Sequence, residues 1–166
     1  LSLRSSGGAR LCIRYRGEPM LELLFSILSS IALVGWVVLI GFPRWDFGRD
    51  RLVGLAIPML FALAYLVLFP PLFFQSPGGY GSIDEVATLL MSDPRIMLAA
   101  WLHYLAFDLL IGRIILLEAQ RSGVPHWATI PPLVLCFLFG PVGWLTFKGI
   151  AFVFRRRRER RESLGG

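Results

Sequence analysis

Four long apolar stretches, separated by polar connections, dominate the chain. They cover residues 23–42, 52–74, 96–117 and 128–147. A helix that crosses a bilayer needs about 20 apolar residues, each adding about 1.5 Å. Three of the stretches contain no charged residue, whereas the third carries His103, Asp108 and Arg113. The pattern predicts an all-α, polytopic (multi-pass) membrane protein with four transmembrane helices.

The longest connection, residues 75–93, predicts a further short helix. Ser82, followed three residues later by Glu85, matches a capping box. Apolar residues then share one face, namely Ile83, Val86, Leu89 and Leu90. We expect an amphipathic helix at the membrane interface between the second and third spans. Asp93 is placed to cap the third span, and Pro94 suits its first helical position.

Composition strengthens the membrane assignment. The chain is 55% hydrophobic and 17% charged, against about 45–50% and about 25% for soluble domains. A water-soluble domain and a disordered chain are both excluded, because a disordered chain is poor in apolar residues. Residues 20–154 form one predicted membrane domain, flanked by basic tails at 1–19 and 155–166. Met20 offers an alternative start, from which the N-terminal tail would not be native.

The net charge of +6 is concentrated beside the spans. Six arginines lie between residues 155 and 161, which indicates membrane orientation and anionic lipid and predicts no nucleic-acid partner. The first span is too long for a signal peptide and lacks a small-residue cleavage site. Four crossings place both termini on one side, which the arginines predict is cytoplasmic or stromal. Arg44, Arg49 and Arg51, between the first two spans, oppose this orientation.

The third span contains the candidate chemistry. Ionisable residues inside a membrane normally face the protein interior or a water-filled cavity. At 100° per residue, His103, Asp108 and Arg113 point in three directions, so this span should be central. Trp101 and Tyr104 share the face of Asp108. Pro58 and Pro141 predict kinks that open a pocket beside the span.

The predicted site residues divide by role. The catalytic candidates are Asp108, His103, Glu118 and Arg113, and the substrate-binding candidates are Trp101, Tyr104 and His126. Structural alternatives remain open: Asp108 bonded to Tyr104, Arg113 paired with Glu118, and His126 as a loop residue. No metal or other cofactor is predicted, because the two histidines and two cysteines lack ligand spacing.

Several segments resemble a known membrane family. They are Gly78–Ser82, Trp101–Leu109 with Gly112 and Arg113, Glu118–His126, and Phe137–Gly143. They are similar to the abscisic-acid-deficient-4-like family, that of a plant protein required to form neoxanthin, with many bacterial members. The resemblance covers residues 20–155. It implies a bacterial inner membrane, or a plastid membrane in a plant or alga.

The resemblance also implies a reaction. The plant conversion of violaxanthin to neoxanthin is a redox-neutral opening of an epoxide to an allene. It needs an acid to protonate the epoxide oxygen and a base to remove a proton from carbon. His103, Asp108 and Glu118 are candidates for these roles, while Arg113 would hold a polar end group.

Three function classes follow. The first is an intramembrane isomerase acting on a carotenoid or isoprenoid lipid. The second is a non-catalytic scaffold or a lipid- or pigment-binding protein, and the third is a small proton-coupled transporter or channel. The expected partners are membrane lipid and a carotenoid or isoprenoid, with a second copy of the chain or a pathway enzyme as further candidates.

Overall fold

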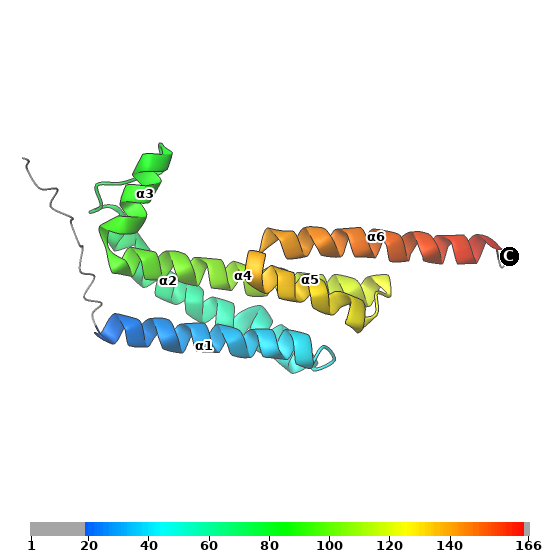
Figure 1. The fold of residues 1–166 in the computed structure, drawn as a ribbon. Coiled ribbons are helices and arrows are strands. Elements are labelled where there is room, and N and C mark those ends of the chain that lie inside the picture. Colours follow the sequence, from blue (N-terminus) through cyan, green and yellow to red (C-terminus); the bar gives the residue numbers. More distant parts are fainter. Residues whose placement is uncertain (1–18, 165–166) are drawn as a thin grey trace, which may run out of the picture.

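The computed structural model describes residues 19–164, and the described part is helical without strands. The predicted tail at residues 1–19 therefore lies, apart from Pro19, outside the described residues. The elements are α1 (Pro19–Gly41), the π-helical η1 (Phe47–Ala56), α2 (Ile57–Phe73), α3 (Ile83–Ser92), α4 (Pro94–Ser122), α5 (His126–Phe139) and α6 (Pro141–Leu164) (Figure 1). The all-α prediction is confirmed.

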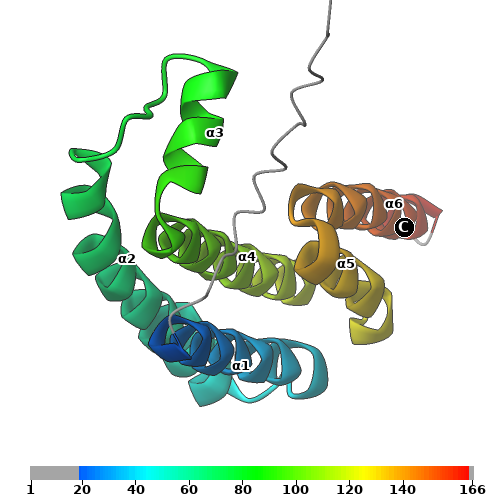
Figure 2. The same cartoon turned by 60° about the vertical axis from the view of Figure 1, so that its left-hand side comes forward.

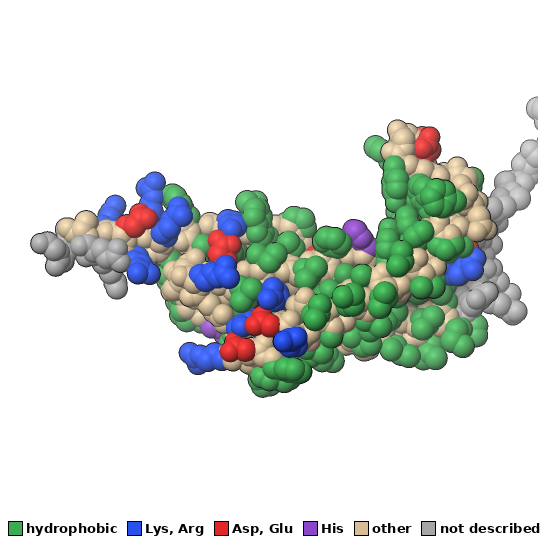
Figure 3. Space-filling model, turned by 180° about the vertical axis from the view of Figure 1, so that it is seen from behind, with side chains coloured by type: hydrophobic (Ala, Val, Ile, Leu, Met, Phe, Trp, Pro, Cys, Tyr) green, Lys and Arg blue, Asp and Glu red, His purple; other side chains and the backbone are tan. Residues whose placement is uncertain are grey.

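Within the described residues, three helical segments are long and apolar enough to cross a membrane. They are Pro19–Gly41, Phe47–Phe73 and Pro94–Ser122. The first three predicted spans therefore have counterparts in the structure, with η1 and α2 continuous as the second. Large apolar side chains such as Val67 and Leu145 stand exposed, and hydrophobic groups spread over the molecular surface (Figure 3). Such a surface suits lipid and is compatible with a membrane protein.

The helix α4 lies at the centre of the bundle, as expected for the third span. It contacts every other described helix, with α1 and α2 on one side and α5 and α6 on the other (Figure 2). Small residues allow the close approach of α1 to α4. A Cβ added at Gly112 would lie 2.8 Å from the Trp36 ring, and one at Gly35 would lie 2.9 Å from Leu109. Leu39, Leu102 and Leu109 are fully buried between these helices.

The expected fourth span, residues 128–147, is not one continuous helix. The chain reverses at Gly140, which has φ 52° and ψ −102°, a conformation that side chains other than glycine strongly disfavour. Pro141 then starts α6 without a backbone N–H, as the first turn of a helix allows. The kink expected at Pro141 is instead a full break, so α5 and α6 form a hairpin. Gly143 lets the two helices touch, since a Cβ there would overlap the Cys136 backbone.

The hairpin bears on how the first and last described helices end relative to one another. The turn at Gly140 meets Asp108, which lies half-way along α4. The pair α5–α6 therefore enters beside one half of α4 and returns towards the end it came from (Figure 1). The start of α1 and the end of α6 lie at opposite ends of the bundle (Figure 1). The expectation that both termini share one side rested on a fourth continuous span, and residues 128–147 do not form one continuous helix.

The short helix α3 begins where the capping box predicts. The Glu85 backbone N–H donates to Ser82 Oγ at 3.1 Å, while the Glu85 carboxylate accepts from the Gly81 N–H at 2.9 Å rather than from Ser82. The helix is turned across the bundle axis (Figure 1). Asp93 caps α4 by accepting the Arg95 N–H at 2.7 Å. The side-chain hydrogen bond from Arg95 also holds the pKa of Asp93 below its usual value.

Candidate functional site

Asp108 is the most enclosed carboxyl group of the third span. It lies half-way along α4, and only 7% of the residue is exposed. A Cβ added at Gly140 would come within 3.1 Å of Asp108 Oδ1, so the hairpin turn packs directly against the carboxyl group. Cys136 of α5 contacts the Asp108 backbone oxygen, with Sγ at 3.9 Å. Asp108 thus faces the protein interior, as the sequence predicted for a charged residue in this span.

The first turn of α6 starts beside Asp108, because α6 begins directly after Gly140. Pro141 has no backbone N–H, and the Gly143 N–H donates to the Gly140 carbonyl oxygen at 3.1 Å. The hairpin turn therefore satisfies part of its own backbone where it packs against the carboxyl group.

Tyr104 connects Asp108 to an aromatic wall. Its side chain lies one turn before Asp108 on the same face, close enough for the two side chains to hydrogen-bond. The Tyr104 ring stacks on Trp101, with 5.6 Å between ring centroids and an angle of 24°. Trp101 donates its indole N–H to Ser29 Oγ of α1 at 3.1 Å and lies 5.9 Å from the Phe25 ring. One face of α4 is thereby tied to α1.

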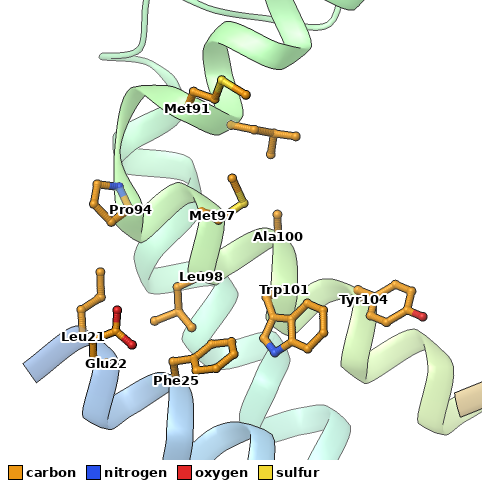
Figure 4. Close-up of a pocket in the computed structure, with 11 residues that line it drawn as sticks. Leu21, Glu22, Phe25, Met91, Pro94, Met97, Leu98, Ala100, Trp101 and Tyr104 are labelled. Atoms are coloured by element: carbon orange, nitrogen blue, oxygen red, sulfur yellow. The ribbon is translucent and has the colours of Figure 1, made fainter. Parts of the chain in front are cut away.

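An apolar groove of about 820 Å³ leads to this aromatic wall. Figure 4 shows Phe25 of α1, Met91 of α3 and Met97 of α4 around it, with Trp101 and Tyr104 along the same side of α4. Glu22 is the one carboxylate among the lining residues and lies near the start of α1, away from Tyr104 (Figure 4). The groove therefore has mainly apolar walls, with Glu22 towards one end and Tyr104 towards the other, a composition common in sites for apolar ligands. Asp108 is not among the lining residues and lies one turn beyond Tyr104 along α4.

His103 lies away from Asp108. It is exposed on the α2 side of α4, where its ring packs against Tyr65 at 5.6 Å and Phe107 at 4.6 Å between centroids. The five-residue spacing turns the two side chains apart, as the helical geometry predicted. The structure does not bring the two candidate acid–base residues together.

Arg113 belongs to a separate polar network. Its guanidinium donates to Asp50 Oδ1 at 2.9 Å and 3.2 Å and packs over Gly54. Arg49 is buried beside the same carboxylate, at 2.7 Å from Asp50 Oδ2, and also donates to Gln120. The structure therefore pairs Arg113 with Asp50 of η1, not with Glu118 as one alternative expected.

Glu118 and His126 occupy two further positions. Lys148 of α6 holds Glu118 through contacts of 2.6 Å and 2.7 Å. His126 Nε2 lies 2.8 Å from the Ile40 carbonyl oxygen, which accepts the hydrogen bond and fixes the start of α5 against α1. These contacts connect helices and lie apart from the groove lining.

Of the seven predicted site residues, the structure brings together Asp108, Tyr104 and Trp101. It adds Gly140 and Ser29, which the sequence reading did not single out as site residues. The Gly140–Pro141 pair was a signal for the break, whereas nothing in the sequence distinguishes Ser29 from Ser26 or Ser30. Among the described residues, no group of three or more His, Cys, Asp or Glu is arranged to hold a metal ion.

A family model described as ABA DEFICIENT 4-like matches residues 23–147. The chain belongs to this ABA4-like family. The match includes Ser29, Trp101, Tyr104, Asp108 and Gly140, but it begins after Glu22 of the groove lining. This family is linked to neoxanthin formation, and the long apolar helices fit a membrane protein. No curated protein and no solved structure was found to match the chain.

Proposed function

We propose that this ABA4-like protein binds a carotenoid or related isoprenoid in the groove and isomerises it at Asp108 and Tyr104. The observation that supports the proposal is a buried carboxyl group beside a tyrosine at which an apolar groove ends. A buried ionisable group is costly in an apolar setting, so a functional role explains its presence. Family membership supplies the substrate class.

The groove dimensions suit one end of a long apolar chain. From Pro94 to Tyr104, at about 1.5 Å per residue, the lining follows α4 for about 15 Å. This is about half the thickness of a bilayer core. An isoprenoid would place one end group near Tyr104, while the rest of its chain lies along the groove and in the surrounding lipid.

The two side chains have complementary chemistry for a redox-neutral epoxide opening. The Tyr104 hydroxyl is a hydrogen-bond donor that would protonate the epoxide oxygen as its carbon–oxygen bond breaks. The Asp108 carboxylate would accept the proton lost from carbon as the new double bond forms. The phenol regains a proton from Asp108, so the net reaction is an isomerisation with no oxidant or reductant.

The alternative is a non-catalytic membrane scaffold or a lipid- or pigment-binding protein. It is favoured by the separation of His103, Glu118 and Arg113 from the groove, since their contacts are with other helices. In that case the aromatic wall would hold the ligand, and Asp108 would only bond Tyr104 and the hairpin.

The discriminating experiment is expression in a violaxanthin-producing host, followed by chromatography of the pigments. Wild-type protein is expected to produce neoxanthin. Asp108→Asn keeps the side-chain size and should abolish the product, while protein accumulation and pigment binding persist. Glu118→Gln, which changes a carboxylate outside the groove, is the matched control. If Asp108→Asn loses the product only because the protein fails to accumulate, the result supports the scaffold alternative.

The same proposal includes an orientation. Among the described residues, the α3 end of the bundle carries Asp84, Glu85 and Asp93, while most arginines lie at the other end. Positively charged residues are retained on the cytoplasmic side, so the α6 end is cytoplasmic or stromal and the start of α1 faces the opposite side. With three crossings and a hairpin, the connection that carries Arg44, Arg49 and Arg51 lies on the cytoplasmic side, as positively charged residues favour. With four crossings the same connection would lie on the opposite side, which these arginines disfavour.

Reporters fused in turn to each terminus test the orientation. A reporter active only in the cytoplasm should work at the C-terminus and fail at the N-terminus. Equal activity at both termini would restore the four-span arrangement. In the proposed orientation, with three crossings and a hairpin, the amphipathic helix α3 lies at the interface of the non-cytoplasmic leaflet, on the same side as the groove opening.

A further inference from the structure

Arginines from three separate segments gather at one end of the bundle. Arg44 lies between α1 and η1, Arg51 lies within η1, and Arg121 lies in the last turn of α4. The last turns of α6 add the exposed arginines Arg155, Arg156, Arg157, Arg158 and Arg160. We call this set the arginine end. Figure 3 shows the Lys and Arg side chains concentrated towards the end where α6 finishes.

The hairpin places the first arginine of α6 level with the end of α4. Asp108 and Gly140 touch, and Lys148 pairs with Glu118, so α6 and the second half of α4 run side by side in the same direction. Residues 108–122 and 140–154 are equally long, about 21 Å at 1.5 Å per residue. The apolar part of α6 therefore ends at Phe154 about level with the end of α4. Arg155 emerges where Arg121 lies.

Several of these cations have no counter-charge within the described structure. Arg49 and Arg113 are neutralised by Asp46 and Asp50, and Lys148 by Glu118. By contrast, Arg44, Arg51, Arg121, Arg157 and Arg160 are exposed and form no ion pair with the described side chains. The arginine end therefore presents excess positive charge at the boundary of the apolar surface.

We propose that the arginine end binds the phosphate headgroups of anionic phospholipids in the leaflet it meets. Arginine forms paired hydrogen bonds with phosphate oxygens, and each basic residue near a membrane surface attracts anionic lipid. Exposed Trp45 and Trp127 flank the arginines, as aromatic side chains do at the headgroup level. That neighbourhood favours lipid over a soluble polyanion. The inference goes beyond the proposed function and does not depend on catalysis.

Lipid retention by the full chain in nanodiscs provides the test. Discs contain equal phosphatidylglycerol and phosphatidylcholine, and native mass spectrometry counts the lipids that stay bound after release. Wild-type protein should retain phosphatidylglycerol in preference. Combined R121Q, R157Q and R160Q should reduce that preference by roughly fivefold for each charge removed. The thermal unfolding temperature should rise as the phosphatidylglycerol fraction of the discs increases. The rise should be larger for wild-type protein than for the triple variant.

Two control variants separate charge from structure. R121K, R157K and R160K keep the charge and should keep most of the preference, while R95Q changes an arginine at the other end and should leave it unaltered. Equal retention of both lipids by wild type, or an unchanged preference in the glutamine variant, overturns the proposal. Retention of RNA in all-phosphatidylcholine discs, without lipid preference, would assign the surface to a soluble polyanion and also overturn it.

Discussion

Asp108 and Gly140 meet where the hairpin turn touches the middle of α4, and a single added carbon at Gly140 would lie 3.1 Å from the carboxylate oxygen. The same glycine has the positive φ that reverses the chain. One residue therefore makes the turn and leaves space for the carboxyl group. The site and the fold depend on the same glycine.

Gly140→Ala should lower the free energy of unfolding by about 1–3 kcal/mol, because alanine is strained at this φ and ψ. It should also reduce product formation, since the new methyl group crowds Asp108. Thermal unfolding in detergent measures the first effect, and pigment chromatography measures the second.

Two glycines provide controls for that variant. Gly123→Ala shares a positive φ of 68° but meets open space, so it should destabilise without affecting the reaction. Gly149→Ala, within α6 and free of contacts, should be neutral or slightly stabilising. Product loss in Gly123→Ala equal to that in Gly140→Ala would show that strain alone explains the effect.

Ser29→Ala should disturb the aromatic wall. It removes the acceptor 3.1 Å from the Trp101 indole N–H, and an unpaired donor in apolar surroundings costs about 1–3 kcal/mol. We expect lower thermal stability and an altered Trp101 near-ultraviolet circular dichroism signal, identified by comparison with Trp101→Phe. Ser30→Ala is the control, because Ser30 bonds only the Ser26 carbonyl on the same helix. Identical spectra for the two serine variants would contradict the assigned role.

Asp50→Asn should weaken the packing of η1 against α4. Asp50 accepts from both Arg49 and Arg113, and hydrogen bonds to charged groups contribute about 1.5–3 kcal/mol. Asp46→Asn removes a more exposed partner of Arg49 and should cost less than about 1 kcal/mol. Chemical unfolding in detergent compares the two. A larger loss in Asp46→Asn would contradict the role of Asp50 as the centre of the network.

His103→Ala should leave the pigment profile unchanged. The ring lies among Tyr65 and Phe107 on the face of α4 turned away from Asp108, so its removal affects packing and not the groove. Pigment chromatography at matched protein levels provides the measurement. Complete loss of product at normal accumulation would place His103 in the reaction.

The sequence predicted the parts of the fold that depend on local pattern. Apolar length gave the first three long helices, and Ser82 and Asp93 marked the starts of α3 and α4. The fourth stretch was read as continuous because apolar character cannot distinguish a crossing from a hairpin. The outcome depends on the backbone of Gly140, whose positive φ is a property of the folded chain.

The site was predictable only where its residues share one helix. Trp101, Tyr104 and Asp108 follow from helical periodicity on α4, whereas Ser29 and Gly140 reach it from other helices. The pairings of Arg113 with Asp50 and Glu118 with Lys148 likewise join distant segments. Sequence spacing offered only the nearer Arg113–Glu118 pair.

The central claim is that the Asp108 carboxyl group meets the ligand at the inner end of the groove. Infrared difference spectroscopy of the purified protein, with and without violaxanthin, measures this most directly. We expect a carboxyl band that shifts when violaxanthin binds and that disappears from the difference spectrum of Asp108→Asn. A spectrum that shows pigment binding but is identical in wild type and Asp108→Asn would contradict the claim.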